Sequence, residues 1–177
     1  MLMDEHSFET VVRVLNDLEA KGYVKSYAIG GGVAAIFYAE PFFTEDIDIL
    51  ILVPEDRENS LDPLRDIYAF LRQCGYHPEG LYVRVEGDLV QFLVASDALF
   101  REALENGVKI MFGSSPTRIL RAEHLLALMA AAGRPKDFVK MNLVLEGAVD
   151  LNYAELDDII KRHNLTDQWA RFERSRQ

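Results

Sequence analysis

The segment DIDILILV, residues 46–53, constrains the fold more than any other part of this sequence. Beyond its two aspartates every residue is apolar, and a strand that is apolar on both faces lies in the interior of a sheet. Side chains at positions i and i+2 of a strand point to the same face. We therefore expect a central strand that begins with Asp46 and Asp48 side by side.

Three glycines precede this strand, in GGGVAA at residues 30–35, and they open a segment that we expect to be helical at about residues 33–39. They allow three interpretations. The glycines can form a tight turn next to two solvated aspartates. They can form a dinucleotide-binding loop, because they satisfy the pattern G-x-G-x-x-A. They can also let a helix N-terminus approach the phosphates of a metal-bound nucleotide.

The positions of the acidic residues separate these interpretations. In the dinucleotide fold the acid that binds the ribose lies at the far end of the second strand, whereas here the aspartates open their strand and the next acid is Glu55. Two solvated aspartates on one strand face repel each other and raise each other's pKa. Two carboxylates also suit Mg²⁺, which takes further ligands from substrate phosphates. The metal-bound nucleotide therefore accounts for both motifs.

The rest of the chain predicts an α+β layout. Amphipathic spacing predicts helices at residues 7–22, with Ser7 as its cap, and 62–75, and a short strand lies at 27–29. LYVRVE and LVQFLV flank Gly87-Asp88 as a hairpin, followed by a helix at 96–106 and a strand at 108–112. From about Arg121 four helical segments follow. We expect an α/β core over residues 1–120 and a helical region over 121–177 packed on it as one compact unit.

Composition narrows the class of protein. The 177 residues, 49% of them hydrophobic, suffice for one domain with a buried core. No apolar stretch is long enough to cross a bilayer, and the acidic start MLMDEHSF is unlike a signal peptide. The single cysteine, Cys74, excludes an internal disulfide. It falls in an apolar helical stripe, so we expect it in the core of a cytoplasmic protein.

The net charge of −10 limits the partners. The average surface would repel a nucleic-acid polymer, so binding one would need a local basic patch. The nearest candidate, KRHN and RFERSR close to the C-terminus, is more simply a solvated helix surface. The four histidines are scattered without i,i+4 pairing, which argues against a zinc site, and we expect His124 to be a hydrogen-bonded helix residue rather than a ligand. P-loop and G-x-S-x-G motifs are also absent from the sequence.

The motifs together resemble a known fold and family. IGGGVAAIFYAEPFFTEDIDILI resembles the signature of the polymerase-β-type nucleotidyltransferases, a glycine pair followed one helix later by D-x-D in a strand. GGVA…TEDIDILI with the later AEHLLALMAAAGRPKD resembles more narrowly the AbiEii-like nucleotidyltransferases, the toxin side of abortive-infection toxin–antitoxin systems. LDDIIKRHNLTDQWARFE is similar to bacterial members of that group. The resemblance implies a nucleotidyltransferase-type mixed β-sheet flanked by helices, with a helical C-terminal part.

The resemblance assigns roles to the residues of the opening motif. It implies that Gly31 and Gly32, supported by Gly30, hold the triphosphate. It implies that Asp46 and Asp48 are catalytic and bind Mg²⁺, or Mn²⁺ in its place.

Residues outside the D-x-D motif receive roles in the same way. Lys136 would be catalytic, with its ammonium group directed at a phosphate. Thr44 would donate its hydroxyl to a phosphate or hold Asp46 in place. Arg134 contacts a phosphate or forms a loop salt bridge, and Asp137 helps to bind the nucleotide or caps the helix that follows it.

The sequence departs from the family pattern at one position. This fold usually carries a third carboxylate on a neighbouring strand, and the matching position in LVQFLV is Gln91. Glutamine can coordinate or hydrogen-bond, so Gln91 remains a nucleotide-binding candidate, but it cannot act as a general base. Glu86 and Asp88 are expected to be turn residues. Met129 stands where toxin relatives often have lysine, and we expect it in the core.

These observations predict a Mg²⁺-dependent nucleotidyltransferase that moves a nucleoside monophosphate from a nucleoside triphosphate to an acceptor hydroxyl. The acceptor is an RNA end, a protein side chain or a small molecule, and the net charge disfavours RNA. A cognate antitoxin is the protein partner that the resemblance implies. The alternative is a nucleotide-binding or protein-interaction module of the same fold that has lost the chemistry, and Gln91 favours it.

Overall fold

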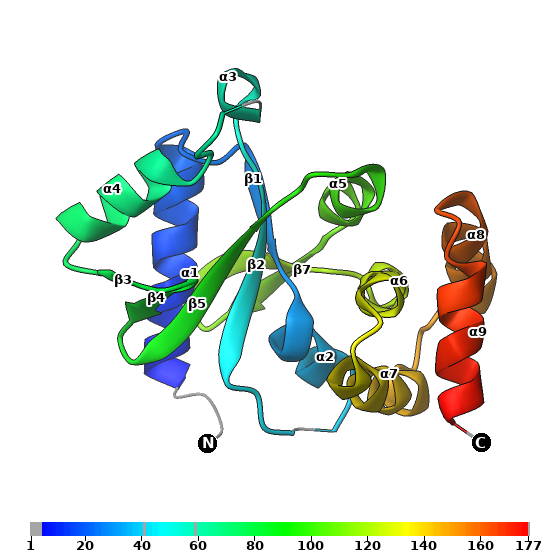
Figure 1. Cartoon of the computed structure of the whole chain (residues 1–177). Helices are drawn as coiled ribbons and strands as arrows, with labels where there is room; N and C mark the ends of the chain where they lie inside the picture. The colour runs from blue at the N-terminus through cyan, green and yellow to red at the C-terminus, as the bar shows by residue number, and fades with distance from the viewer. Residues whose placement is uncertain (1–4, 41, 59, 177) are drawn as a thin grey trace.

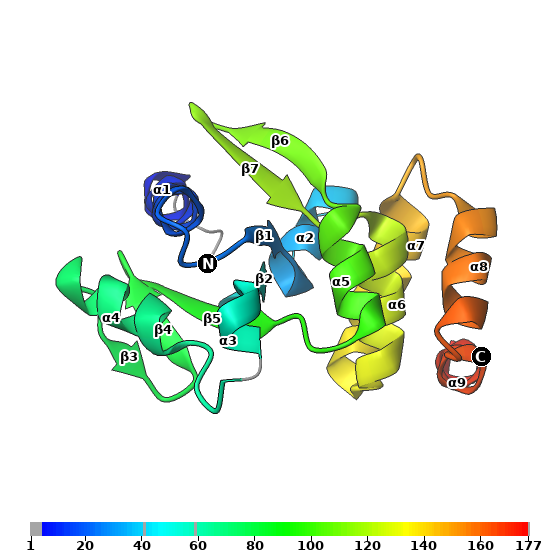
Figure 2. The ribbon, with the colours of Figure 1, turned by 90° about the horizontal axis from the view of Figure 1, so that it is seen from above.

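The computed structural model describes residues 5–40, 42–58 and 60–176. Within these residues a mixed sheet of seven strands lies between two layers of helices (Figure 1). Helices α1 and α4 lie on one side, α2, α5, α6 and α7 on the other, and α8 and α9 lie outside α6 and α7 (Figure 2). The elements are α1 (Glu5–Ala20), β1 (Ser26–Ile29), α2 (Gly31–Tyr38), β2 (Asp46–Leu52), α3 (Glu55–Glu58), α4 (Arg65–Gln73), β3 (Pro78–Glu79), β4 (Tyr82–Val85), β5 (Asp88–Val94), α5 (Ala98–Glu105), β6 (Val108–Phe112), β7 (Ser115–Ile119), α6 (Ala122–Ala132), α7 (Pro135–Gly147), α8 (Tyr153–Arg162) and α9 (Thr166–Ser175).

Strand β2 is the middle strand of the sheet, whose order is β3-β4-β5-β2-β1-β7-β6. It runs parallel to β5 and antiparallel to β1, and β1 in turn is parallel to β7. This confirms the predicted α+β class and the central position of the DIDILILV strand.

The antiparallel pairing of β1 with β2 brings the glycine motif to the aspartates. Ile29, the last residue of β1, pairs with Ile49, and the N–H of Gly30 donates to the carbonyl oxygen of Asp48 at 2.8 Å. Helix α2 therefore begins directly beside the start of β2. Because β7 is parallel to β1, with the N–H of Leu120 donating to the carbonyl of Ile29 at 2.9 Å, helix α6 begins close by.

The sheet has a separate apolar core on each face. Ile47, Ile49 and Ile51 of β2 point to the core on the α1 side. Leu50 of the same strand points to the core on the α6 side. That second core joins strand residues to the C-terminal helices, and it includes Phe172 of α9. Each face of β2 is therefore covered, as its apolar sequence predicts.

Most of the expected elements are confirmed. The stripe of α1 is buried, and each of the four C-terminal helices contributes buried apolar residues to the core on the α6 side. The β4–β5 hairpin turns at Glu86 and Gly87, whose φ angles of 49° and 101° suit a two-residue turn. Glu86 is thus a turn residue, as expected, whereas Asp88 is the first residue of β5 and pairs with Val85, so the turn lies one residue earlier than predicted. The members of the buried α1 stripe are Phe8, Val11, Val12, Leu15 and Leu18.

Four local predictions are wrong. Helix α2 begins at Gly31 rather than near residue 33. Ser7 does not cap α1, which already includes Glu5; its hydroxyl donates instead to Asp88 in the β4–β5 hairpin. Cys74 is exposed, because it follows the last residue of α4 and lies beyond the buried stripe of that helix. Strand β7 was not expected, since Pro116 and several polar residues obscure its alternation.

Met129 is buried on the α6 side, as expected. Among the helices of residues 5–40, 42–58 and 60–176, none combines the length and the apolar character that a membrane crossing requires.

Candidate functional site

Asp46 and Asp48 lie on one face of β2, at the N-terminal end of the strand. Their neighbours Ile47 and Ile49 are buried on the opposite face, at 2% and 0% exposure, while both aspartates are half-buried. The aspartates share their face with Leu50, which reaches the core on the α6 side. The alternation predicted from the sequence therefore holds, and the carboxylates stand at the edge of an apolar interior.

The carboxyl group of Asp48 has a raised pKa. Burial is the main cause, and the charge of Asp46 adds to it. Lys140, Arg134 and Lys136 oppose the shift through their charges, in that order of effect. The surrounding protein thus leaves the ionised form of Asp48 undercompensated, which is the electrostatic condition of a site that takes a cation.

Gly31 makes the closest approach to the aspartates. Its φ of 54° lies in the left-handed region, and a Cβ atom added there would be 1.8 Å from Oδ2 of Asp48. Only glycine fits, both for conformation and for space. The first residue of α2 is thus packed against the carboxylate with nothing but hydrogen between them.

Gly32 is enclosed by two polar side chains. A Cβ atom on it would lie 2.3 Å from Oγ1 of Thr44 and 3.1 Å from Nζ of Lys140. Thr44 donates its hydroxyl to the carbonyl oxygen of Asp46 at 3.3 Å, which matches one of the two roles expected of it. Gly30 is limited by Leu50, whose Cδ1 would be 2.7 Å from an added Cβ. Close packing is therefore tightest at Gly31 and Gly32, whereas the contact at Gly30 is with the movable end of a leucine side chain.

Gln91 lies next to Asp48 in the sheet. The parallel pairing of β2 with β5 places the two residues in register. Gln91 in turn pairs with Tyr82 on β4. The charge of Asp46 raises the pKa of the Tyr82 phenol, and a hydrogen bond between these two side chains acts in the same direction. Sequence reasoning missed Tyr82, because only the strand register brings it to the aspartates.

Arg134 and Asp137 form an ion pair at the start of α7. Nε of Arg134 donates to Oδ2 of Asp137 at 2.6 Å, and Asp137 is 1% exposed. Asp137 is the third residue of the helix, and Arg134 is the N-cap residue without a side-chain cap bond. The interpretation of Asp137 as the cap is therefore wrong. The salt-bridge interpretation of Arg134 is confirmed, although the pair also faces the aspartates, whose charges raise the pKa of Arg134 after the larger effect of Asp137.

Lys140 has a stronger electrostatic effect on Asp48 than the predicted Lys136 does. Both belong to α7, but Lys136 is exposed and has the weaker effect on the pKa of Asp48. Lys140 is half-buried and lines the same cavity as Asp48. The two lysines are four residues apart on one helix face, and that spacing was the signal in the sequence that could have identified Lys140.

A cavity of about 170 Å³, which we call the cleft cavity, is bordered by six of these residues: Gly31, Asp48, Gln91, Arg134, Asp137 and Lys140. It lies between the sheet, α5, α6 and the start of α7. Its polar lining comes from β2, β5 and α7, and α6 supplies much of its apolar lining. The lining residues are Gly31, Asp48, Leu50, Gln91, Leu93, Phe100, Leu120, Leu125, Leu128, Met129, Ala132, Arg134, Asp137 and Lys140.

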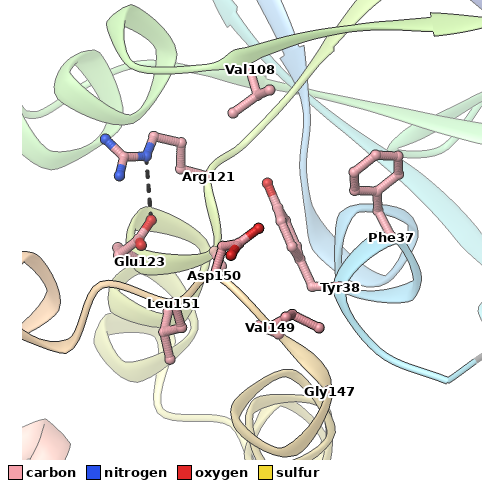
Figure 3. Close-up of a pocket in the computed structure, with 11 residues that line it drawn as sticks. Phe37, Tyr38, Val108, Arg121, Glu123, Gly147, Val149, Asp150 and Leu151 are labelled. Carbon is pink, nitrogen blue, oxygen red and sulfur yellow. Dashed lines mark ion pairs between the residues drawn. The ribbon is translucent and has the colours of Figure 1, made fainter.

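A larger cavity of about 360 Å³ lies at the other end of α2, bordered by Phe37, Tyr38 and the loop after α7 (Figure 3). Its buried polar groups have protein partners. Tyr38 donates to the carbonyl of Leu120 at 2.8 Å, and burial raises the pKa of this phenol to about 12. Glu123 pairs with Arg121 at 3.3 Å. None of the predicted site residues lines this cavity, so the cleft cavity is the better candidate.

The protein ligands that a metal ion would find in the cleft are few. Within the described part of the chain, no group of three or more His, Cys, Asp or Glu side chains is arranged to hold a metal ion. The expected set is Asp46 and Asp48, with Gln91 beside them. Such a set fits Mg²⁺, which commonly binds one or two carboxylates and completes its shell with water and substrate phosphates.

His124 is hydrogen-bonded, as expected, and lies outside the cleft lining. Its Nε2 is 2.9 Å from Oε1 of Glu102, a residue of α5 that also contacts His163 and Arg162 of the C-terminal helices. This second cluster of charged groups connects helices and has no part in the cleft.

The sequence matches no protein-family model and no curated protein. Solved structures, however, resemble the whole chain. An antigenic nucleotidyltransferase-like protein from Paracoccidioides brasiliensis aligns with a TM-score of 0.57 and 15% identity over 92% of each chain. The solution structure of the antibiotic-resistance factor ANT(2'')-Ia gives a TM-score of 0.58 and 14% identity over 98% of each chain.

A crystal structure of ANT(2'')-Ia with adenylyl-2''-tobramycin aligns with a TM-score of 0.56 and 16% identity, over 90% of this chain and 97% of that chain. Identities this low show the fold and leave activity open. The chain therefore has the nucleotidyltransferase-type fold that the D-x-D and glycine motifs predicted.

Proposed function

We propose that this protein is a nucleotidyltransferase, which moves a nucleoside monophosphate from a nucleoside triphosphate to an acceptor hydroxyl and releases pyrophosphate. The observation that carries the proposal is the contact of Gly31 with Asp48, where an added Cβ would lie 1.8 Å from the carboxylate oxygen. It holds the N-terminus of α2 against the D-x-D carboxylates. A phosphate seat and a pair of metal-binding oxygens then adjoin each other.

The triphosphate would bind at the N-terminus of α2. The first N–H groups of a helix lack intrahelical acceptors and carry partial positive charge, which favours an anion. Gly31 and Gly32 keep this end free of side chains. Lys140 lies beside Gly32 and would add a charge-assisted hydrogen bond. Arg134 and Lys136 would contribute positive charge from the start of α7.

Asp46 and Asp48 would hold Mg²⁺, or Mn²⁺ in its place. When bound, the ion would neutralise charge on the phosphates and on the pyrophosphate leaving group. The chain's own residues would orient the nucleotide: the α2 N-terminus binds the phosphates, Thr44 fixes the backbone at Asp46 through its 3.3 Å hydrogen bond, and Lys140 keeps the phosphates near Asp48.

A second candidate function is a nucleotide-binding or protein-interaction module that has lost the chemistry. Gln91 favours it, because an amide beside Asp48 cannot take a proton from the attacking hydroxyl. The undercompensated charge of Asp48 favours the enzyme, since a module without metal chemistry gains nothing from two adjacent carboxylates.

The narrower resemblance to the AbiEii-like family extends the proposal. It would make this chain the toxin-like member of a bacterial toxin–antitoxin pair, acting in the cytoplasm, where nucleoside triphosphates are available. It would also make residues 1–120 the catalytic core and residues 121–177 a helical region that packs on it. Co-purification with the product of a neighbouring gene would test this extension.

Nucleotide-dependent stabilisation tests the proposed function. We would measure Tm with ATP, GTP, CTP and UTP, with and without Mg²⁺. A ligand at a hundredfold excess over its Kd stabilises the folded state by about 2.7 kcal/mol. We expect one nucleotide to raise Tm in the presence of Mg²⁺ and the Asp46→Asn/Asp48→Asn variant to abolish the shift.

The matched control is Asp17→Asn/Asp56→Asn, which removes the same charge from two exposed aspartates away from the cleft. This variant should keep the full shift. If no nucleotide raises Tm of the wild-type protein, the proposed function is wrong. If nucleotides bind but labelled nucleotide is never transferred to any acceptor, the binding module is correct.

A further inference from the structure

The cleft cavity has a charged mouth and an apolar interior. Its polar lining consists of Asp48, Gln91, Arg134, Asp137 and Lys140. The cavity has fourteen lining residues: these five polar residues, Gly31 and eight apolar residues. A group that enters the interior therefore finds apolar surface and very few hydrogen-bonding partners.

The lining at the mouth carries as many cations as carboxylates. Asp137 pairs with Arg134 at 2.6 Å, and Lys140 is the cation with the largest effect on Asp48. A polycationic acceptor needs an excess of negative charge to replace its water. In the proposed function Mg²⁺ takes up the negative charge that Asp46 and Asp48 leave uncompensated, so the lining offers no such excess and an aminoglycoside does not fit it.

The interior fits one aromatic ring. The volume of about 170 Å³ is close to that of an engineered 150 Å³ cavity lined by Leu, Ile and Phe, which binds benzene. A sugar would bring several hydroxyl groups into contact with residues such as Phe100, Leu128 and Met129. Each hydroxyl left without a partner carries a desolvation cost, whereas an aromatic ring has no such group to desolvate.

Gln91 also favours an acidic hydroxyl as the acceptor. The residue beside Asp48 cannot take a proton. A phenol of the tyrosine type has a pKa of about 10, whereas the pKa of water is far higher, and aliphatic hydroxyls ionise as reluctantly as water. A phenol therefore needs far less help from a general base.

We propose that the acceptor carries a phenolic hydroxyl, with its ring in the interior of the cleft cavity and its oxygen at the mouth beside Asp48 and Gln91. This inference rests on the proposed function. The phenolic oxygen attacks the α-phosphorus, and a new P–O bond forms. The bond from that phosphorus to the bridging oxygen breaks, its electron pair leaves with pyrophosphate, and the phenolic proton passes to water. The ring fills the interior and excludes water, which would otherwise compete as the acceptor.

Binding of 4-fluorophenol tests the cavity without any nucleotide. Ala131 and Ala132, at the end of α6, are both exposed, but of these two only Ala132 lines the cavity. We would titrate the probe and follow its ¹⁹F resonance. We expect saturable binding by the wild-type protein and by Ala131→Phe, at least tenfold weaker binding by Ala132→Phe, and an intermediate loss for Ala132→Leu. Equal Tm values would show that each variant folds.

The result that overturns the inference is the absence of saturable binding, or equal binding by the Ala131 and Ala132 variants. Tobramycin, as the polycationic probe, should not displace 4-fluorophenol, and displacement would count against the balanced charge of the mouth.

Transfer assays identify the source of the phenol. 4-Fluorophenol and the peptide Gly-Tyr-Gly would be incubated separately with Mg²⁺ and the nucleotide that raises Tm, and the products analysed by mass spectrometry. A nucleotidylated small phenol points to a small-molecule acceptor, and a nucleotidylated peptide points to a protein side chain. If nucleotides raise Tm but neither phenol is modified, the phenolic acceptor is wrong and nucleotide binding stands. If no nucleotide raises Tm, the proposed function fails, and the acceptor assignment fails with it, even where 4-fluorophenol binds.

Discussion

Two clusters of charged groups in this molecule shift the pKa of a carboxyl group in opposite directions. Glu102 of α5 accepts hydrogen bonds from Arg162, His163 and His124, and these bonds, led by that of Arg162, lower its pKa to about 2. In the cleft, burial and the neighbouring Asp46 raise the pKa of Asp48, and the cations that oppose the shift act through charge alone.

The difference separates a structural cluster from a candidate site. The Glu102 cluster is complete, because its carboxylate on α5 accepts from donors on α6 and at the end of α8, and it fixes α8 against α5 and α6. The aspartates of β2 are incomplete, since the protein supplies less positive charge than they need. Ionised groups kept without sufficient partners are characteristic of sites that bind a charged ligand.

The largest expected effect is the loss of nucleotide transfer in Asp48→Asn. The substitution keeps the size of the side chain but removes a metal-binding charge, and the rate of transfer should fall by about 1,000-fold. Single-turnover transfer of a labelled nucleotide measures it. Glu102→Gln is the matched control, because it makes the same change of carboxylate to amide in the other cluster. Its rate should stay within about threefold of wild type at a temperature where both variants are folded, and a comparable loss in the two variants would erase the distinction between the clusters.

The second effect is on stability. Here we expect the loss in Glu102→Gln and none in Asp48→Asn. Glu102→Gln removes the charged acceptor of His124 and His163, and one of the three carboxylates that pair with Arg162. We therefore expect the free energy of unfolding to fall by about 2 kcal/mol. Tm should fall by roughly 4–8 °C. Asp48→Asn, measured without divalent ions, should not lower Tm. Urea unfolding of both variants provides the comparison, and a Tm for Asp48→Asn below that of wild type would contradict it.

The cleft motif was predictable from the sequence because its parts are local. Alternation along one strand places Asp46 and Asp48 on the same face, and the glycines precede them by a single helix. The position of Gln91 followed from a resemblance, and the β2–β5 register supplies the physical reason for it. The Glu102 cluster was out of reach, since its partners His124 and Arg162 are 22 and 60 residues away along the chain.

The choice between the two lysines of α7 shows the same limit. Lys136 and Lys140 are indistinguishable by residue type and share one helix face. Which of them reaches the aspartates depends on how α7 is placed against α2, and that is decided by packing over the core on the α6 side. The prediction that Cys74 is buried was wrong for a related reason. The apolar helical stripe continues in the sequence beyond Gln73, where α4 ends.

The third effect compares these lysines. Lys140→Met should weaken nucleotide affinity by about tenfold, through the loss of one charge-assisted hydrogen bond. Lys136→Met removes the same charge one turn away on an exposed position, and we expect a change of about twofold or less. Isothermal titration with the nucleotide that raises Tm gives both constants. If Lys136→Met has the larger effect, the assignment from the sequence is correct and the placement of Lys140 in the cleft has no functional weight.

The smallest effect is the pH dependence of stability, and its sign should differ between the clusters. The folded-state pKa of Asp48 is raised above its ordinary value of 3.8, so the folded protein holds this proton more tightly than the unfolded chain does and loses stability as the pH rises above 3.8. Asp48→Asn should therefore match wild type below that pH and gain in Tm as the pH increases.

The folded-state pKa of Glu102 is lowered from 4.5 to about 2, so its contribution is complete above pH 4.5 and disappears as the pH falls towards 2. The deficit of Glu102→Gln should be constant at neutral pH and shrink in acid. Tm measured from pH 3 to pH 7 in a chelating buffer tests both signs, and a single common sign would mean that the aspartates of the cleft are as well compensated as Glu102.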